Sequence, residues 1–402
     1  MTVIHRDILT AARSIESHIV CTPCPPAYML SQMLDCEVYC KLDYLQHTGS
    51  FKERGVANAL LHLPDQCKGV IAASAGNHAL ALAYHGQQMQ VPVTVVMPMH
   101  APLIKVETCR RFGARVVQEG KSFVEAVTQA RQLCDQQGLT YIHGFDNEYV
   151  ITGQGTMGLE ILHQVPDVDA VIVPVGGGGL IAGVSMAIKA TQPKVQVIGV
   201  EPASMPLFSK SLQQGHPVTL PVVPTLADGL AVGRMGDLSF ALAAKSVDRV
   251  VRVDESEMAL AVLRLLEVEK AVVEGAGAAG LAALLSGKLP ELKGKKVVLP
   301  LCGGNIDPLV LRRVIEFGMS ADQRLCRLNV TISDRPGGLA ALTDALARNA
   351  VSIQHIRHDR IFAGPDVNRV LVQLVLEVRH AEHLQRVIGY LHDKGYAIEP
   401  QS

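Results

Sequence analysis

Short apolar runs rich in β-branched residues alternate with longer runs of helical character through the first three quarters of the chain. This alternation constrains the fold most. The expected strands cover residues 69–73, 93–97, 114–118, 170–175, 195–200, 249–253 and 296–300. The expected helices cover residues 77–88, 103–112, 121–136, 180–191, 256–269 and 308–317. Such a pattern predicts an α/β fold with parallel sheets and helices on both faces. Ligands bind at the carboxyl ends of the strands in sheets of this kind.

The pattern changes near Gly318, where the polar segment 319–324 is expected to connect to a second domain. The expected elements of that domain are strand 327–333, helix 338–349, strands 352–358 and 369–378, helix 381–394 and strand 396–399. This βαββαβ order is ferredoxin-like. A domain this small would bury its sheet better by pairing with another copy.

Composition excludes several classes of function. The chain has 402 residues, 48% apolar residues and a formal net charge of −1 without runs of like charge. No nucleic-acid or membrane partner is therefore expected, and a small neutral or zwitterionic ligand fits better. Residues 1–13 lack the apolar stretch of a secretory signal, and nine cysteines is an odd number, so we expect a cytoplasmic protein with reduced thiols. The uncharged stretch 170–188 contains Pro174 and a run of four consecutive glycines, which favours a strand, a turn and a helix over a membrane span.

The first chemical motif is the segment Thr48–Gly55, with Lys52 at the expected start of a helix. The positive end of the helix dipole and the neighbouring Arg54 both favour a neutral amine at Lys52. A neutral amine is the form that makes an imine. On its own, the motif could equally be a surface lysine in a loop.

The second motif, Ser74–His78, follows an expected strand. Backbone amides at a strand-to-helix turn can hold a carboxylate, and Asn77 can donate to a phenolate-like oxygen. An ordinary helix N-cap is the alternative.

The third motif places Gly176, Gly177, Gly178 and Gly179 between a strand and a helix. Free amides in a glycine turn can surround a phosphate at a helix N-terminus. The motif matches neither the dinucleotide fingerprint nor a nucleotide P-loop, and a flexible turn is the alternative. The fourth motif, Leu301–Asn305, again follows a strand and contains Cys302. A thiol is a weak, neutral partner, so a pyridine nitrogen facing it would stay unprotonated; a structural cysteine is the alternative.

Together the four motifs, in this order over Thr22–Phe317, resemble the fold type II pyridoxal-phosphate enzymes, and most closely their serine/threonine dehydratase branch. The resemblance implies a tryptophan synthase β-like catalytic part over residues 1–320, whose smaller subdomain spans about 48–150. It also implies pyridoxal 5'-phosphate as cofactor. The implied cofactor-binding residues are Phe51, Lys52, Asn77, Gly176, Gly177, Gly178, Gly179, Leu180 and Cys302, with Lys52 catalytic. The implied substrate-binding residues are Ser74, Ala75, Gly76 and Asn77, and Glu274 matches an acidic residue near the cofactor.

The implied reaction is that of a carbon–nitrogen lyase. It converts L-threonine to 2-oxobutanoate and ammonia, and L-serine to pyruvate and ammonia. A serine racemase is similar but has a serine at the place of Ala75, so racemisation is disfavoured. The racemase-like divalent metal site is also incomplete, because Glu201 is present but Leu207 stands six residues later; no tightly bound metal is expected.

Residues 326–402 resemble an ACT domain, an amino-acid-sensing module. The resemblance rests on Val330–Leu339, where a strand, a sharp turn and a helix start could receive a carboxylate. The implied effector-binding residues are Asp334, Arg335, Gly337, Gly338 and Leu339. Isoleucine is the expected effector because 2-oxobutanoate is its precursor, although a purely dimerising module is the alternative. A homodimer or homotetramer is expected by resemblance. A serine-specific dehydratase, a β-replacement enzyme and a non-catalytic amino-acid sensor also remain open.

Overall fold

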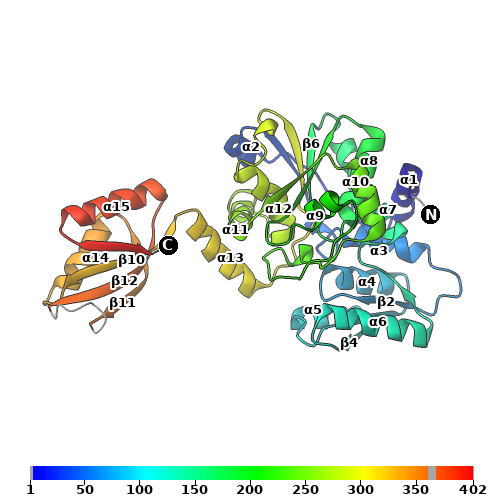
Figure 1. The fold of residues 1–402 in the computed structure, drawn as a ribbon, viewed down its shortest axis with the longest axis horizontal. Helices are drawn as coiled ribbons and strands as arrows, with labels where there is room; N and C mark the ends of the chain where they lie inside the picture. The colour runs from blue at the N-terminus through cyan, green and yellow to red at the C-terminus, as the bar shows by residue number, and fades with distance from the viewer. Residues whose placement is uncertain (1–2, 361–367, 402) are drawn as a thin grey trace. The chain divides into compact units, whose positions relative to one another are not determined.

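The computed structural model describes residues 3–360 and 368–401, and the chain divides into two compact units, residues 1–307 and 308–402. Figure 1 shows the elements of each unit. The two units have separate hydrophobic cores: the first unit has more than one core cluster, and the second unit has a cluster of its own.

The larger sheet of the first unit has five strands in the order β1-β9-β6-β7-β8, and all neighbours are parallel. Its strands are β1 (Glu37–Lys41), β6 (Ala170–Pro174), β7 (Gln196–Pro202), β8 (Arg249–Val253) and β9 (Lys296–Pro300). Every residue of β6 is buried, as expected for a strand covered on both faces. The parallel sheet predicted from the sequence is confirmed.

The smaller sheet has four parallel strands in the order β4-β3-β2-β5. Its strands are β2 (Val70–Ala73), β3 (Val93–Met97), β4 (Arg115–Gln118) and β5 (Thr140–Tyr141). β2 and β3 are fully buried and occupy the middle of the sheet.

Helices cover both faces of the larger sheet. On β6, Val171 and Val173 pack in the core that also contains residues of α8, whereas Ile172 contacts Gly280 of α12. The α-helices of this unit are α1 (His5–Ile15), α2 (Tyr28–Leu34), α3 (Lys52–Leu61), α4 (Asn77–Gln88), α5 (Leu103–Arg111), α6 (Phe123–Gln137), α7 (Glu148–Gln164), α8 (Gly179–Thr191), α9 (Leu207–Gln214), α10 (Asp237–Ser246), α11 (Glu255–Arg264) and α12 (Gly275–Leu285). Short helical turns are η1 (Asp43–Leu45), η2 (Asp228–Leu230), η3 (Leu265–Glu269) and η4 (Pro290–Leu292). No helix in the described ranges is long and apolar enough to span a membrane.

The second unit is an antiparallel sheet in the order β11-β12-β10-β13, with helices α14 and α15 packed into its core. Its elements are α13 (Pro308–Ala321), β10 (Leu325–Ser333), α14 (Gly338–Arg348), β11 (Ser352–Asp359), β12 (Arg369–Glu377), α15 (Ala381–Asp393) and β13 (Ala397–Gln401). The predicted βαββαβ order is confirmed. The expected connector 319–324 is wrong in its first half, because α13 continues to Ala321 before the chain enters β10.

Candidate active site

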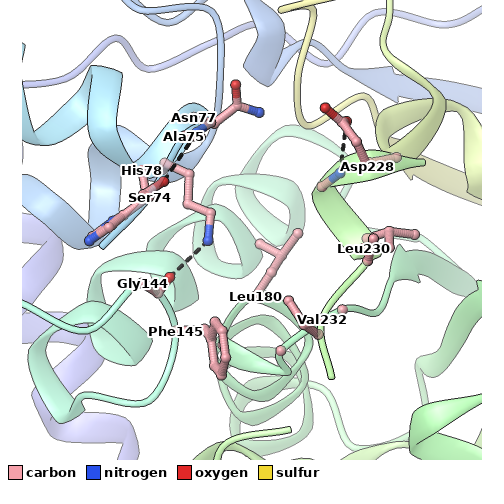
Figure 2. A pocket seen from close by; sticks show the side chains of 18 of the residues that line it. Ser74, Ala75, Asn77, His78, Gly144, Phe145, Leu180, Asp228, Leu230 and Val232 are labelled. Atoms are coloured by element: carbon pink, nitrogen blue, oxygen red, sulfur yellow. Dashed lines mark hydrogen bonds between the residues drawn. The ribbon is translucent and has the colours of Figure 1, made fainter. Parts of the chain in front are cut away.

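All four sequence motifs of the first unit line one cavity of about 430 Å³. Ser74, Gly176 and Cys302 follow β2, β6 and β9, which places them at the carboxyl ends of parallel strands as predicted. Figure 2 shows Ser74, Ala75 and Asn77 on one side of this cavity and Asp228, Leu230 and Val232 on the other. Every residue named from the sequence for cofactor or substrate in this unit, including Glu274, lies on its wall.

Lys52 is the first residue of α3, and its amine points into the cavity. Nζ donates a hydrogen bond of 2.8 Å to the carbonyl oxygen of Gly144 and lies 5.2 Å from the centroid of the Phe51 ring. Burial lowers the pKa of Lys52 to about 8. The sequence interpretation expected a lowered pKa but attributed it partly to Arg54; burial is the main cause, and Arg54 is not among the groups that act on Lys52.

Arg54 faces away from the cavity into a buried cluster of charges. Its guanidinium donates to both carboxylate oxygens of Asp43, at 2.7 and 2.8 Å, and also to Glu160. Glu160 also receives a 2.5 Å hydrogen bond from the buried Lys41. Because Asp43 precedes α3 and Glu160 lies on α7, the cluster holds the helix that carries Lys52 against its neighbour.

The four glycines form a turn that has no room for side chains. Gly178 has a φ of +97°, and a Cβ on Gly179 would stand 2.7 Å from the carbonyl oxygen of Phe145. A Cβ on Gly177 would overlap the Phe145 ring. The turn leads directly into α8, whose first residues are Gly179 and the buried Leu180. Backbone amides at such a helix start attract an anionic group such as a phosphate.

The turn of Ser74, Ala75 and Gly76 leads into α4, which begins at Asn77. The Gly76 N–H donates to the Ser74 hydroxyl at 3.2 Å, and no atom lies within 4 Å of where a Gly76 Cβ would stand. The first backbone N–H groups of a helix have no acceptor within the helix. This side of the cavity can therefore receive a carboxylate.

His78, the second residue of α4, was not predicted as a site residue but lines the cavity. Its Nε2 donates to the carbonyl of Ile142 at 3.0 Å. Burial, with Lys52 as a further cause, lowers the pKa of His78 to about 3. The imidazole is therefore neutral at physiological pH.

Glu274 is buried, and its Oε1 accepts a hydrogen bond of 2.8 Å from Nδ2 of Asn77. Burial raises the pKa of Glu274 to about 7, with Asp228 adding to the shift and Lys105 opposing it. Asn305, which was quoted in the fourth motif but given no role, donates from Nδ2 to Oδ1 of Asn77 at 2.9 Å. Asn77 is thus held from two sides.

Cys302 is buried at the end of β9, and burial raises the pKa of its thiol well above the ordinary value. Its carbonyl accepts from the N–H of Phe51 at 2.9 Å, which ties the fourth motif to the first. The thiol is neutral, as expected from the sequence.

The sequence motifs did not identify the apolar part of the wall. Phe145, Leu230 and Val232 lie there with Leu180, and none of the first three belongs to a recognisable pattern. A salt bridge of 3.7 Å between Lys105 of α5 and Asp228 of η2 also lines the cavity. These residues come from segments far apart in the chain, so only the fold brings them together.

Glu201 serves a structural purpose here. Its carboxylate accepts from the backbone N–H groups of Phe208 and Ser209 at the start of α9. Within residues 3–360 and 368–401, no group of three or more His, Cys, Asp or Glu side chains is arranged to hold a metal ion.

The residues named for an effector lie at one turn of the second unit, between β10 and α14. Gly337 has a φ of +91°, and a Cβ on Gly338 would overlap the carbonyl oxygen of Ser333. Asp334 forms an ion pair of 3.1 Å with Arg360, while Arg335 and Leu339 flank the glycines. The turn has the sharp geometry expected from its sequence.

The cavity of the first unit fits pyridoxal phosphate. It offers an amine of lowered pKa at the start of α3, a glycine turn open to an anion after β6 and a neutral thiol after β9.

Comparison with known proteins agrees with this assignment. Residues 15–303 match the family model described as pyridoxal-phosphate dependent enzyme, and residues 327–393 match the ACT domain. An L-threonine ammonia-lyase of Thermotoga maritima is 42% identical over 394 residues, which cover 98% of each chain. The structure of processed threonine deaminase isoform 2 from Solanum lycopersicum has a TM-score of 0.75 and 37% identity, over 78% of this chain and 87% of that one. The structure of a serine racemase from Dictyostelium discoideum has a TM-score of 0.72 and 36% identity, over 76% of this chain and all of that one.

Proposed function

The chain belongs to the family of pyridoxal-phosphate-dependent enzymes, and on that premise we propose that it converts L-threonine to 2-oxobutanoate and ammonia. One observation carries the proposal: the amine of Lys52, with a pKa lowered to about 8, shares a cavity with the glycine turn and the Ser74–Asn77 turn. The near full-length similarity to an L-threonine ammonia-lyase supports the choice of substrate.

In this proposal each part of the cofactor is bound by a different set of residues. Gly176, Gly177, Gly178 and Gly179, with Leu180, would hold its phosphate; Lys52 would hold its aldehyde carbon beside Phe51; Asn77 would meet its ring oxygen; and Cys302 would face its ring nitrogen. The neutral thiol of Cys302 gives that nitrogen no proton. When bound, the cofactor supplies an electron-withdrawing group that acidifies the Cα proton of an attached amino acid.

Lys52 then acts as the base. Burial shifts its pKa from 10.5 to about 8, so a sizeable fraction of the amine is neutral near physiological pH. The amine accepts the Cα proton while the helix start at Ser74, Ala75, Gly76 and Asn77 holds the substrate carboxylate. The β-hydroxyl leaves with a proton as water, and hydrolysis of the released enamine gives the 2-oxo acid and ammonia. The apolar wall of Phe145, Leu230 and Val232 keeps bulk water from that side of the cavity.

Racemisation is less well supported. Proton exchange on the second face of Cα needs a second acid or base, and Ala75 has no exchangeable side-chain proton. The similarity to a serine racemase structure therefore reflects the shared scaffold.

The wider role follows from the product. L-serine would give pyruvate by the same steps, and 2-oxobutanoate from L-threonine would feed isoleucine synthesis in the cytoplasm. The second unit would bind isoleucine at Asp334, Arg335, Gly337, Gly338 and Leu339 and slow the enzyme. A homodimer or homotetramer is proposed, because a domain as small as the second unit would bury its sheet better by pairing with another copy.

The experiment compares the wild type with Lys52→Ala, using a 2-oxo acid assay with L-threonine and L-serine. Turnover is expected to fall by on the order of 10³-fold in Lys52→Ala, because both the attachment point and the base are lost. Lys245→Ala, a change at an exposed lysine of α10, is the control and should leave turnover intact. A wild type that binds the cofactor but releases no 2-oxo acid would instead favour a non-catalytic sensor.

The effector is tested separately with isoleucine and valine at millimolar concentration. Isoleucine is expected to bind and to lower the rate with L-threonine. If neither amino acid changes binding or rate, the regulatory part of the proposal is wrong, while the catalytic part stands.

A further inference from the structure

Asn305 lies just beyond β9, within a series of hydrogen bonds that runs from Thr48 to the cavity. Its Nδ2 donates to the carbonyl oxygen of Thr48 at 2.7 Å and to Oδ1 of Asn77 at 2.9 Å. Nδ2 of Asn77 then donates to Oε1 of Glu274 at 2.8 Å. Four segments that are far apart in the sequence therefore meet through side-chain amides.

The Thr48 carbonyl, at one end of this series of hydrogen bonds, decides which group donates and which accepts in each of them. The Thr48 carbonyl can only accept a hydrogen bond, so the amide nitrogen of Asn305, and not its oxygen, must face it. The second hydrogen of that nitrogen reaches Asn77, so the oxygen of Asn77 must face Asn305. The nitrogen of Asn77 is consequently turned to Glu274.

Glu274 does not disturb this direction when it titrates. Its Oε1 can accept from Asn77 as a carboxylate or as the carbonyl oxygen of a neutral acid. The orientation of both amides is therefore the same on either side of the pKa of about 7.

Close packing keeps Asn305 in place. Gly49 has a φ of +78°, and a Cβ there would stand 2.7 Å from Oδ1 of Asn305. A Cβ on Gly303 would overlap Oε1 of Glu274 and approach Nδ2 of Asn77 to 3.3 Å. The glycines of the first and fourth motifs thus leave space that the hydrogen-bonded side chains fill.

We propose that Asn305 is a positioning residue that fixes the amide of Asn77 so that Asn77 can only donate into the cavity. One Nδ2 hydrogen of Asn77 goes to Glu274, and the other has no acceptor among the described residues. Asn77 lines the cavity, so this second hydrogen is available to an oxygen of the bound cofactor. The inference rests on the proposed function, since it concerns the same cofactor.

The test is a double-mutant cycle on the full chain with Asn77→Ala, Asn305→Asp and both changes together. Asn305→Asp keeps the shape but replaces the donor with an acceptor, so Asn77 must turn its nitrogen to residue 305 and its oxygen toward Glu274. The measurements are the dissociation constant of pyridoxal phosphate and the visible absorption maximum of the holoenzyme. Asn305→Asp is expected to weaken cofactor binding about tenfold and to move the maximum in the direction that Asn77→Ala moves it. In the Asn77→Ala background, Asn305→Asp should lower the affinity for the cofactor by less than about threefold more.

Asn349→Asp is the matched control, because Asn349 also donates to a backbone carbonyl, at 2.8 Å, but lies in the second unit. It should leave both measurements unchanged. If Asn305→Asp does not fold, Asn305→Ala carries the same cycle, with a smaller expected loss. The inference is overturned if Asn305→Asp has the cofactor affinity and the absorption maximum of the wild type. It is also overturned if Asn305→Asp lowers cofactor affinity by the same factor in the wild type and in Asn77→Ala. Absence of threonine turnover in a wild type with normal cofactor binding would overturn the proposed function and leave this inference standing.

Discussion

Lys52 and Glu274 show how one cause, burial, shifts two neighbouring groups in opposite directions. Removal from water disfavours the charged form, so the amine titrates lower than usual and the carboxyl titrates higher. The pKa of Lys52 falls to about 8 and that of Glu274 rises to about 7. Both residues therefore change protonation near physiological pH, which suits groups that exchange protons with a substrate.

The lowered pKa of Lys52 predicts a pH dependence for its reactivity. In the cofactor-free protein, the rate of labelling with pyridoxal phosphate, trapped by borohydride, should rise with pH and reach half its maximum near pH 8. Only the neutral amine attacks an aldehyde. An ordinary lysine would reach half its maximal labelling rate at a pH near its pKa of about 10.4. Lys52→Ala should lose the fast labelling phase. A rate that still climbs steeply between pH 9 and pH 10 would contradict the prediction.

The raised pKa of Glu274 predicts a pH-dependent stability difference between the wild type and Glu274→Gln. Between pH 4.5 and about 7 the folded protein binds more protons at this site than the unfolded chain, so the wild type loses stability as pH rises through that range. Glutamine does not titrate. The free energy of unfolding of Glu274→Gln, measured by denaturant titration of the cofactor-free protein, should therefore improve relative to the wild type by a few kcal/mol, about 2–3, from pH 5 to pH 8.

Glu16→Gln is the control for this measurement, because Glu16 is exposed at the end of α1. Both variants are measured at the two pH values, and the change of about 2–3 kcal/mol is expected for Glu274→Gln alone. If Glu274→Gln behaves in the same way as Glu16→Gln, the carboxyl of Glu274 does not titrate in the predicted range.

Most of the site residues could be predicted from the sequence, but the contacts that determine their pKa values and orientations could not. Lys52, Asn77, the four glycines and Cys302 were named from motifs, and the fold brings them to one cavity. The roles of Asn305, Phe145 and Leu230 depend on contacts between distant segments, which no local pattern records. The sequence interpretation of Arg54 was wrong because it lies beside Lys52 in the chain but points into a different environment.

Among the elements, α3 determines where the reactive amine lies, and buried ion pairs form one part of its attachment to α7. Arg54 on α3 is fully buried together with Asp43, and Glu160 of α7 completes the ion pairs. A buried charge that loses its partner is costly, because it has neither water nor a counter-ion. The position of α3 therefore depends on the complete cluster.

Replacing Arg54 with methionine tests this dependence. The change leaves Asp43 and Glu160 short of a cation in the interior and should lower the free energy of unfolding by about 3–5 kcal/mol. Arg348→Met is the matched control, since the ion pair of Arg348 with Asp344 is exposed and should contribute less than about 1 kcal/mol. Chemical denaturation of both variants measures the difference. A loss at Arg54 no larger than that at Arg348 would show that the buried cluster does not stabilise the fold.

Four elements have the boundaries predicted from the sequence. β3, β8, β9 and α4 begin and end at the predicted residues. The predicted helix 256–269 instead ends as α11 at Arg264 and continues as the π-helical turn η3. β1 was not predicted, because its place beside β9 is a pairing between distant parts of the chain.

At the scale of the whole molecule, the proposed catalytic site and the proposed effector site lie in different units. The cavity and all four motifs lie within residues 1–307, and the turn named for an effector lies within residues 308–402. Since each unit has its own hydrophobic core, the first should remain folded without the second.

A chain that ends at Asp307 is therefore expected to keep threonine turnover within about threefold of the full chain and to lose any response to isoleucine. Initial rates with and without isoleucine, measured side by side for both chains, give the comparison. A response that persists in the shortened chain would place the effector site in the first unit. Complete loss of cofactor binding would show that the two units depend on each other for folding.

The sequence by itself determined the class of fold, the order of elements in the second unit and the residues of the four motifs. These are local properties, because the periodicity of strands and helices, and the turns at strand ends, depend on residues that are close together in the sequence. The tertiary structure alone decided which side chains share the cavity, which groups titrate near neutral pH and which amide atoms face inward. Those properties depend on burial and on contacts between segments far apart in the chain, and both exist only after the chain has folded.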